Sequence, residues 1–183
     1  MRADAVRNRE ALVAAARSAF LDQGTDAPLD DVAKRAGVGA GTLYRHFPTR
    51  NDLLAAVYVD DIETLCADIE RLGESLDPEA ALVSYLDLQV DYGLRKIGLQ
   101  RAIREVLADD TKVETFSLCK THMMKAVDVL LDRAVEAGVV RPDVDSHTLV
   151  KLLHGISTAC DQNPELAGSM IAVVRDGMLK PKA

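Results

Sequence analysis

Four polar side chains that can contact nucleic acid crowd into residues 40–46, a segment of about two helical turns. They are Thr42, Tyr44, Arg45 and His46. Hydroxyl and cationic groups hold nucleic-acid phosphates, and an arginine can also bond both major-groove acceptors of a guanine. The cluster therefore favours a nucleic-acid contact surface, in which Arg45 either reads a base or clamps a phosphate.

A short helix, a tight turn and a second short helix are expected to position this cluster. The helices are predicted over 29–36 and 40–46, because Gly37-Val38-Gly39 makes a turn and Phe47-Pro48 ends the second helix. This is the layout of a helix-turn-helix, whose second helix enters a major groove of DNA. The alternative is a small helical hairpin with a solvated face, which would not need both a tyrosine and a histidine exposed there.

The distribution of charge agrees with a polyanion-binding N-terminal part. The whole chain of 183 residues carries a formal charge of −7, but its first 50 residues hold eight basic and six acidic side chains. That segment is therefore +2 and the remainder −9. A basic end on an acidic body is expected when only one part of a protein meets DNA.

A set of spaced residues around the motif agrees with one known family. They are Val32-Ala33, Ala36-Gly37-Val38, Gly41-Thr42-Leu43-Tyr44, His46-Phe47, Arg50 and Leu53. On these residues, the segment of about residues 9–55 closely resembles the TetR family of bacterial transcriptional repressors. Beyond it, the resemblance rests on chain length and on helix number and order.

The resemblance implies a role for each matching position. Phosphate contacts are implied for Thr42, Tyr44, His46 and Arg50, and an approach to base edges for Gly39, Ala40 and Gly41, with Arg45 beside them. The sequence departs from the family pattern at two places. Pro28 replaces a threonine that caps the second helix, and Gly39-Ala40 replaces the usual serine and a frequent lysine. Specificity is therefore expected to depend partly on thymine methyl groups and on DNA shape.

The rest of the chain is predicted to be all-α, with about nine helices in total. The ranges are 7–23, 29–36, 40–46, 49–72, 78–95, from about 98 to 107, 111–137, from 145 or 146 to 161, and 165–179. Thr49 and Asp52 form a capping-box-like start for the fourth helix, and Gly73 is expected to end it. We expect a helix-turn-helix DNA-binding domain over residues 1–48 and a helical domain for ligand binding and dimerisation over 49–183.

A ligand pocket in the second domain is implied by the resemblance and partly supported by the residues. Tyr85, Gln89 and Tyr92 fall on one helix face, and an inner face with polar tips is typical of a pocket for a mainly apolar molecule. Tyr58, Phe116 and Met123 are further candidate lining residues. Plain core packing is the alternative, and for the stripe of Phe116, Cys119 and Met123 it is the better explanation.

The last two long helices are predicted to form a two-fold dimer interface through seams of apolar and small residues. The candidate interface residues are Leu149, Leu152, Leu153, Gly155, Ile156, Ala159, Ile171, Val174 and Met178. Such a dimer would place two recognition helices about one DNA turn apart, or at a multiple of it, and read a palindrome.

Together these features predict a homodimeric, TetR-like, ligand-responsive repressor that binds a double-stranded DNA operator and is released by a small apolar or amphipathic effector. A protein-binding adaptor without DNA affinity and a small all-α enzyme are the rivals; no catalytic set, nucleotide loop, metal spacing or cofactor motif is evident. Three scattered cysteines, with no signal peptide and no membrane-spanning run, favour a cytoplasmic protein.

Overall fold

The computed structural model describes residues 2–96, 98–99 and 113–180. Within these ranges the chain forms eight α-helices, one short 3₁₀ helix and no strand, which confirms the all-α prediction. The α-helices are α1 (Arg2–Gln23), α2 (Leu29–Arg35), α3 (Ala40–His46), α4 (Arg50–Ser75), α5 (Pro78–Arg95), α7 (Val113–Glu136), α8 (Ser146–Ala159) and α9 (Ala167–Met178). Most of the helix predicted from about 98 to 107 lies outside the described residues.

Local signals account for most helix ends. The capping box at α4 is confirmed: the Thr49 amide donates to the Asp52 carboxylate at 2.9 Å, and the Asp52 amide donates to the Thr49 hydroxyl at 3.1 Å. Asp77 caps α5 by accepting from the Ala80 amide at 3.0 Å. Gly73 does not end α4 as expected, because the helix continues to Ser75.

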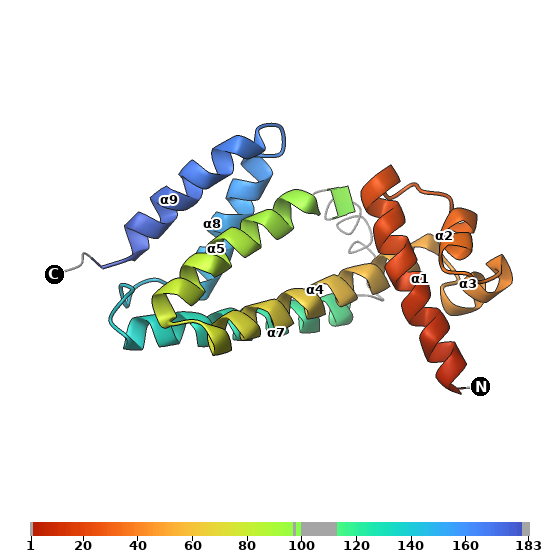
Figure 1. Ribbon diagram of the computed structural model, residues 1–183, viewed down its shortest axis with the longest axis horizontal. Helices are drawn as coiled ribbons and strands as arrows, with labels where there is room; N and C mark the ends of the chain where they lie inside the picture. The colour runs from red at the N-terminus through yellow and green to blue at the C-terminus, as the bar shows by residue number, and fades with distance from the viewer. Residues whose placement is uncertain (1, 97, 100–112, 181–183) are drawn as a thin grey trace. The chain divides into compact units, whose positions relative to one another are not determined.

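The N-terminal compact unit comprises residues up to Ile62 together with a second segment, Gly98–Ser117. Its helices α1, α2 and α3 pack around one apolar core together with the first part of α4 (Figure 1). The fully buried members of this core include Leu12, Ala16, Ala19, Val32, Leu43, Leu53 and Val57. This core fixes the two short helices, which would be too short to be stable alone.

An ion-pair cluster also joins α1 to α4 inside this unit. The Arg17 guanidinium contacts the carboxylates of Asp60 and Asp61, with a distance of 2.7 Å from its Nε to Asp61 Oδ1. Asp61 is only 4% exposed. Because a buried carboxylate needs a charged partner, this contact fixes α1 on α4.

The second compact unit holds Glu63–Ile97 and Leu118–Ala183. In its described part α5 packs closely on α8, and α9 lies against both (Figure 1). The two helices approach closely at Gly93 of α5, where a Cβ atom would lie 2.6 Å from the Cβ of buried Ser157 on α8. Along the described residues, no helix is both long enough and apolar enough to cross a lipid bilayer.

Candidate nucleic-acid interface

Helix α3 has a buried face that anchors it and an outer face that is free to bind. Leu43 is fully buried and Phe47, just after the helix, is 3% exposed. Tyr44 is 49% exposed, and Arg45 is exposed beside it. A large aromatic side chain at the surface of so short a helix is not needed for packing, so it is available to a partner.

The turn between α2 and α3 sets the direction of the second helix. Gly37 has a φ of +69°, in the left-handed region that favours glycine. The Val38 amide donates to the Ala33 carbonyl at 3.0 Å, and the Gly37 amide donates to that of Lys34 at 3.1 Å. These bonds satisfy the last carbonyls of α2 and hold the turn in one conformation.

The start of α3 presents little but backbone. Gly39, Ala40 and Gly41 are all exposed, and a Cβ atom added at Gly39 or Gly41 would meet nothing within 4 Å. Packing within the chain therefore does not require glycine at either position. The bare surface lets a partner approach the backbone closely.

Thr42 and His46 are half-buried on the flanks of the exposed residues. Seven of the eight predicted contact positions are therefore either exposed on this face or flank it, and Arg50 is the eighth. The His46 ring lies 6.3 Å from the Phe47 ring, which in turn has the Arg9 guanidinium 5.6 Å from its centroid. The cation–π contact thus holds Phe47, and His46 lies beside that ring.

Arg50 has a structural role that the sequence did not reveal. Its Nη1 atom donates to the carbonyl oxygens of Thr25 and Ala27, at 2.7 and 2.8 Å, and the contacts are partly buried. The guanidinium thus ties the start of α4 to the turn before α2. Pro28 comes directly after this turn, and as the N-cap residue of α2 it provides no side-chain hydrogen bond.

We expect Arg50→Lys to weaken DNA binding although it keeps the charge. A lysine side chain is shorter than that of arginine and its ammonium group is not held in a plane, so it reaches the two carbonyl groups less well and the turn before α2 is expected to loosen. Unfolding is expected to become easier by about 1–2 kcal/mol, measured by urea denaturation. A different outcome would contradict this structural role. If Arg50→Lys is as stable as the wild type, and Arg50→Ala weakens DNA binding without a loss of stability, then Arg50 acts only on phosphate.

Comparisons with known proteins agree with this geometry. Residues 12–57 match the family profile of bacterial regulatory proteins of the tetR family, and residues 77–180 match that of the transcriptional regulator SbtR-like C-terminal domain. The second match alone spans more than half of the chain. The chain belongs to the TetR family of bacterial transcriptional regulators.

Individual relatives extend this likeness. The HTH-type transcriptional repressor LfrR of Mycolicibacterium smegmatis is 40% identical over 90 residues, which cover 48% of this chain and 46% of that protein. The chain thus matches about half the length of this relative. The crystal structure of the TetR transcriptional regulator SCO0520 from Streptomyces coelicolor is 34% identical, covers 96% of this chain and 99% of its own, and has a TM-score of 0.77. A TetR regulatory protein from Mycobacterium vanbaalenii is 30% identical, with coverage of 98% and 99% and a TM-score of 0.75.

In the C-terminal unit of this TetR-family protein, two predicted pocket residues are buried without partners. Tyr85 is fully buried and Gln89 is 8% exposed, and neither the Tyr85 hydroxyl nor Gln89 Oε1 has a hydrogen bond among the described residues. Burial raises the pKa of the Tyr85 phenol well above its ordinary value, so the group is neutral at physiological pH. Tyr92 is half-buried and Met123 is 9% exposed. In the N-terminal unit, the rings of Tyr58 and Phe116 are in contact at 5.0 Å.

The predicted dimer residues divide into two sets. Leu149, Leu153, Ile156 and Met178 are buried within one chain, which removes them from a surface between two copies. Leu152, Gly155 and Ala159 are exposed, and Ile171 and Val174 are half-buried. The interface hypothesis therefore narrows to this second set, together with Met170 and Val173 of α9, which are 38% and 74% exposed.

Proposed function

We propose that this TetR-family regulator is a homodimeric repressor that binds a palindromic operator and leaves it when a small effector binds. The observation that carries the proposal is the outer face of α3, where Tyr44 and Arg45 are exposed on a helix anchored by buried Leu43. The name of LfrR as a transcriptional repressor supports repression over activation.

Each contact position on this face is given a role by its chemistry. Thr42, Tyr44 and His46 are hydrogen-bond donors suited to phosphate oxygens, which fix the register of the protein on DNA. The Arg45 guanidinium is proposed to bond the O6 and N7 atoms of a guanine. The bare backbone from Gly39 to Gly41 is proposed to lie closest to the base edges.

Dimerisation is proposed to use the exposed face of α8 and α9. Gly155 and Ala159 offer a flat surface next to Leu152, which is 50% exposed, and Val173 is the most exposed large apolar side chain of α9. Apolar surface of this kind is stabilised when a second copy covers it with the same face, which gives a closed two-fold dimer.

Selection of bound sequences from a random pool of double-stranded DNA, at moderate salt, tests the proposal. We expect a palindrome whose half-sites lie about one helical turn apart or at a multiple of it. Binding is expected to weaken steeply with salt, since phosphate contacts release counterions. Recovery of no preferred sequence together with a flat salt dependence would favour a protein-binding adaptor instead.

The effector is proposed to bind beside Tyr85 and Gln89. Unpaired polar atoms cost free energy when buried, and they are common where a ligand completes the hydrogen bonds. Since the Tyr85 phenol is neutral and Gln89 is an amide, the group that they would recognise is uncharged and carries a hydrogen-bond donor.

Tyr85→Phe is expected to raise the free energy of unfolding by about 1 kcal/mol, because it removes a buried hydroxyl that has no partner while it keeps the ring. Chemical denaturation of the ligand-free protein measures this. Tyr44→Phe is the matched control: its hydroxyl is on an exposed side chain, so its removal leaves stability unchanged within about 0.5 kcal/mol. A loss of stability in Tyr85→Phe would mean that the hydroxyl already has a partner inside the protein.

A further inference from the structure

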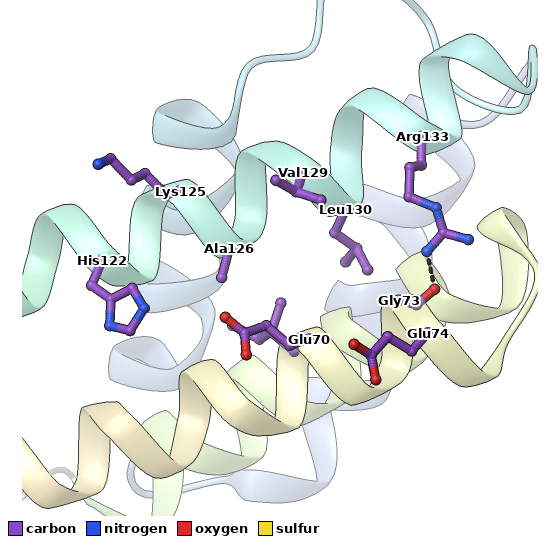
Figure 2. A pocket seen from close by; sticks show the side chains of 10 residues that line it. Glu70, Gly73, Glu74, His122, Lys125, Ala126, Val129, Leu130 and Arg133 are labelled. Atoms are coloured by element: carbon purple, nitrogen blue, oxygen red, sulfur yellow. Dashed lines mark hydrogen bonds between the residues drawn. The ribbon is translucent and has the colours of Figure 1, made fainter.

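Most arginine side chains that the structure describes are engaged by oxygen atoms of the protein itself. In the N-terminal unit, the arginines that contact carboxylates are Arg7, Arg17 and Arg35. In the C-terminal unit they are Arg71, Arg95, Arg141 and Arg175. Arg50 and Arg133 donate to backbone carbonyl groups, as Figure 2 shows for Arg133 and Gly73. Among the described arginine side chains, only Arg9 and Arg45 have neither kind of partner.

Arg9 is held at the end of α3 although it belongs to α1. Its guanidinium lies 5.6 Å from the centroid of the Phe47 ring, and the His46 ring lies 6.3 Å from the same ring. Phe47 directly follows α3 and is 3% exposed, so the core fixes its position. Arg9 therefore lies at the edge of α3 where His46 is proposed to contact phosphate.

The contact with Phe47 leaves Arg9 able to bind an anion. An aromatic ring carries no net charge, so it orders the guanidinium without neutralising it. The Arg9 side chain is exposed, and within the described ranges no carboxylate pairs with it. A side chain that is already ordered loses less conformational entropy when it binds a partner.

The beginning of α1 lies outside the apolar core of its unit. Leu12 is the first buried residue among the described side chains of this helix, and residues 3–7 are all exposed. In Figure 1 this end of α1 extends away from α2. Packing within the chain therefore leaves the helical turn that carries Arg9 open to an outside partner.

From these observations we infer that Arg9 is a further DNA-binding residue, whose guanidinium bonds a backbone phosphate next to the one held by His46. The inference rests on the proposed operator binding and adds α1 to its contact surface. The planar fork of guanidinium donors matches phosphate oxygens, which makes arginine well suited to this contact. Contacts of this kind position a protein on DNA but do not read its sequence.

Arg9→Gln tests the inference, with binding measured by fluorescence anisotropy over a series of salt concentrations. Two duplexes of equal length are used, one with the selected operator and one with an unrelated sequence. Each phosphate contact contributes about 0.9 to the slope of log affinity against log salt, and a dimer has two copies of Arg9. The slope is therefore expected to decrease in magnitude by about 2 on both duplexes. At about 0.1 M salt, this corresponds to binding that is roughly 10- to 100-fold weaker.

Matched variants separate a phosphate contact from a general effect of charge or packing. Arg71→Gln removes the same charge from α4 in the C-terminal unit, where Arg71 is paired with Asp68, and it should leave the slope unchanged. Arg9→Lys keeps the charge and should keep most of the slope. Arg9→Met is a second neutral variant with a long apolar stem, and it should reproduce the slope of Arg9→Gln. Thermal melting shows whether each variant remains folded.

The possible failures can be told apart. If the wild type binds both duplexes with a steep salt dependence and the neutral Arg9 variants keep its slope, the inference is wrong and the proposed function stands. A lower melting temperature with an unchanged slope would mean that Arg9 only supports Phe47. Loss of preference at one base pair, again with an unchanged slope, would replace the phosphate contact by a base contact. If the wild type binds neither duplex, the proposed function itself fails.

Discussion

Gly93→Ala is expected to destabilise the C-terminal unit by about 2–3 kcal/mol, although alanine is the better helix former. The added methyl group would lie 2.6 Å from the Cβ of Ser157, a side chain that is 2% exposed, and rotation of the serine hydroxyl cannot move its Cβ. Helices α5 and α8 must then move apart, and the contacts along their shared apolar surface are lost. A fall in Tm of roughly 5–10 °C is expected for a chain of this size, measured by calorimetry.

A second substitution makes the physical cause testable. Ser157→Gly removes both atoms that crowd residue 93, so it should recover most of the stability that Gly93→Ala loses. Gly177→Ala is the matched control, because a Cβ atom at that helical position meets nothing within 4 Å. Its stability should be equal to that of the wild type or higher. If the double variant were no more stable than Gly93→Ala alone, crowding by Ser157 would not be the cause.

The helix-turn-helix could be predicted from the sequence because its boundaries depend on local chemistry. Gly37 provides a left-handed turn, Phe47-Pro48 ends α3, and Thr49 with Asp52 starts α4. Each of these signals acts within about four residues, so no tertiary information is needed. The predicted limits of α2 and α3 agree with the structure to within one residue.

The end of α4 could not be predicted in this way. Gly73 carries the usual signal for a helix end, but in the structure it lies inside α4, half-buried against the Arg133 guanidinium of α7. Its small size serves a contact between residues that are 60 positions apart. The structural role of Arg50 could not be predicted for the same reason, because its partners are distant in the sequence. They are also backbone carbonyl groups, which every residue has, so no residue type indicates them.

Periodicity also could not assign the two faces of α8 to their partners. Leu149 and Leu153 belong to one apolar seam, and Leu152, Gly155 and Ala159 to the neighbouring one. The structure gives the first seam to the core of a single chain, through packing on α5, and leaves the second exposed. A hydrophobic stripe shows that something must cover it, but only the fold distinguishes a neighbouring helix from a second copy.

Arg45→Ala is expected to have the largest effect on operator binding. A bidentate contact to guanine contributes about 1–3 kcal/mol, and a two-fold dimer makes the contact in both half-sites. The loss is therefore roughly 2–6 kcal/mol, or about 30-fold to more than 10⁴-fold in affinity for the selected operator, measured by fluorescence anisotropy at fixed salt. Affinity for unrelated DNA should change much less, since it depends on phosphate contacts.

The salt dependence separates base reading from phosphate clamping at this position. If Arg45 reads guanine, Arg45→Ala removes the preference at one base pair of each half-site and leaves the slope of log affinity against log salt unchanged. If it clamps phosphate, affinity falls equally on all sequences and the slope decreases in magnitude by about 2, since each phosphate contact contributes about 0.9 and there are two half-sites. Tyr44→Phe is the control: it removes a neutral phosphate donor, so binding should weaken on every sequence with no change of slope, because a hydroxyl displaces no counterion.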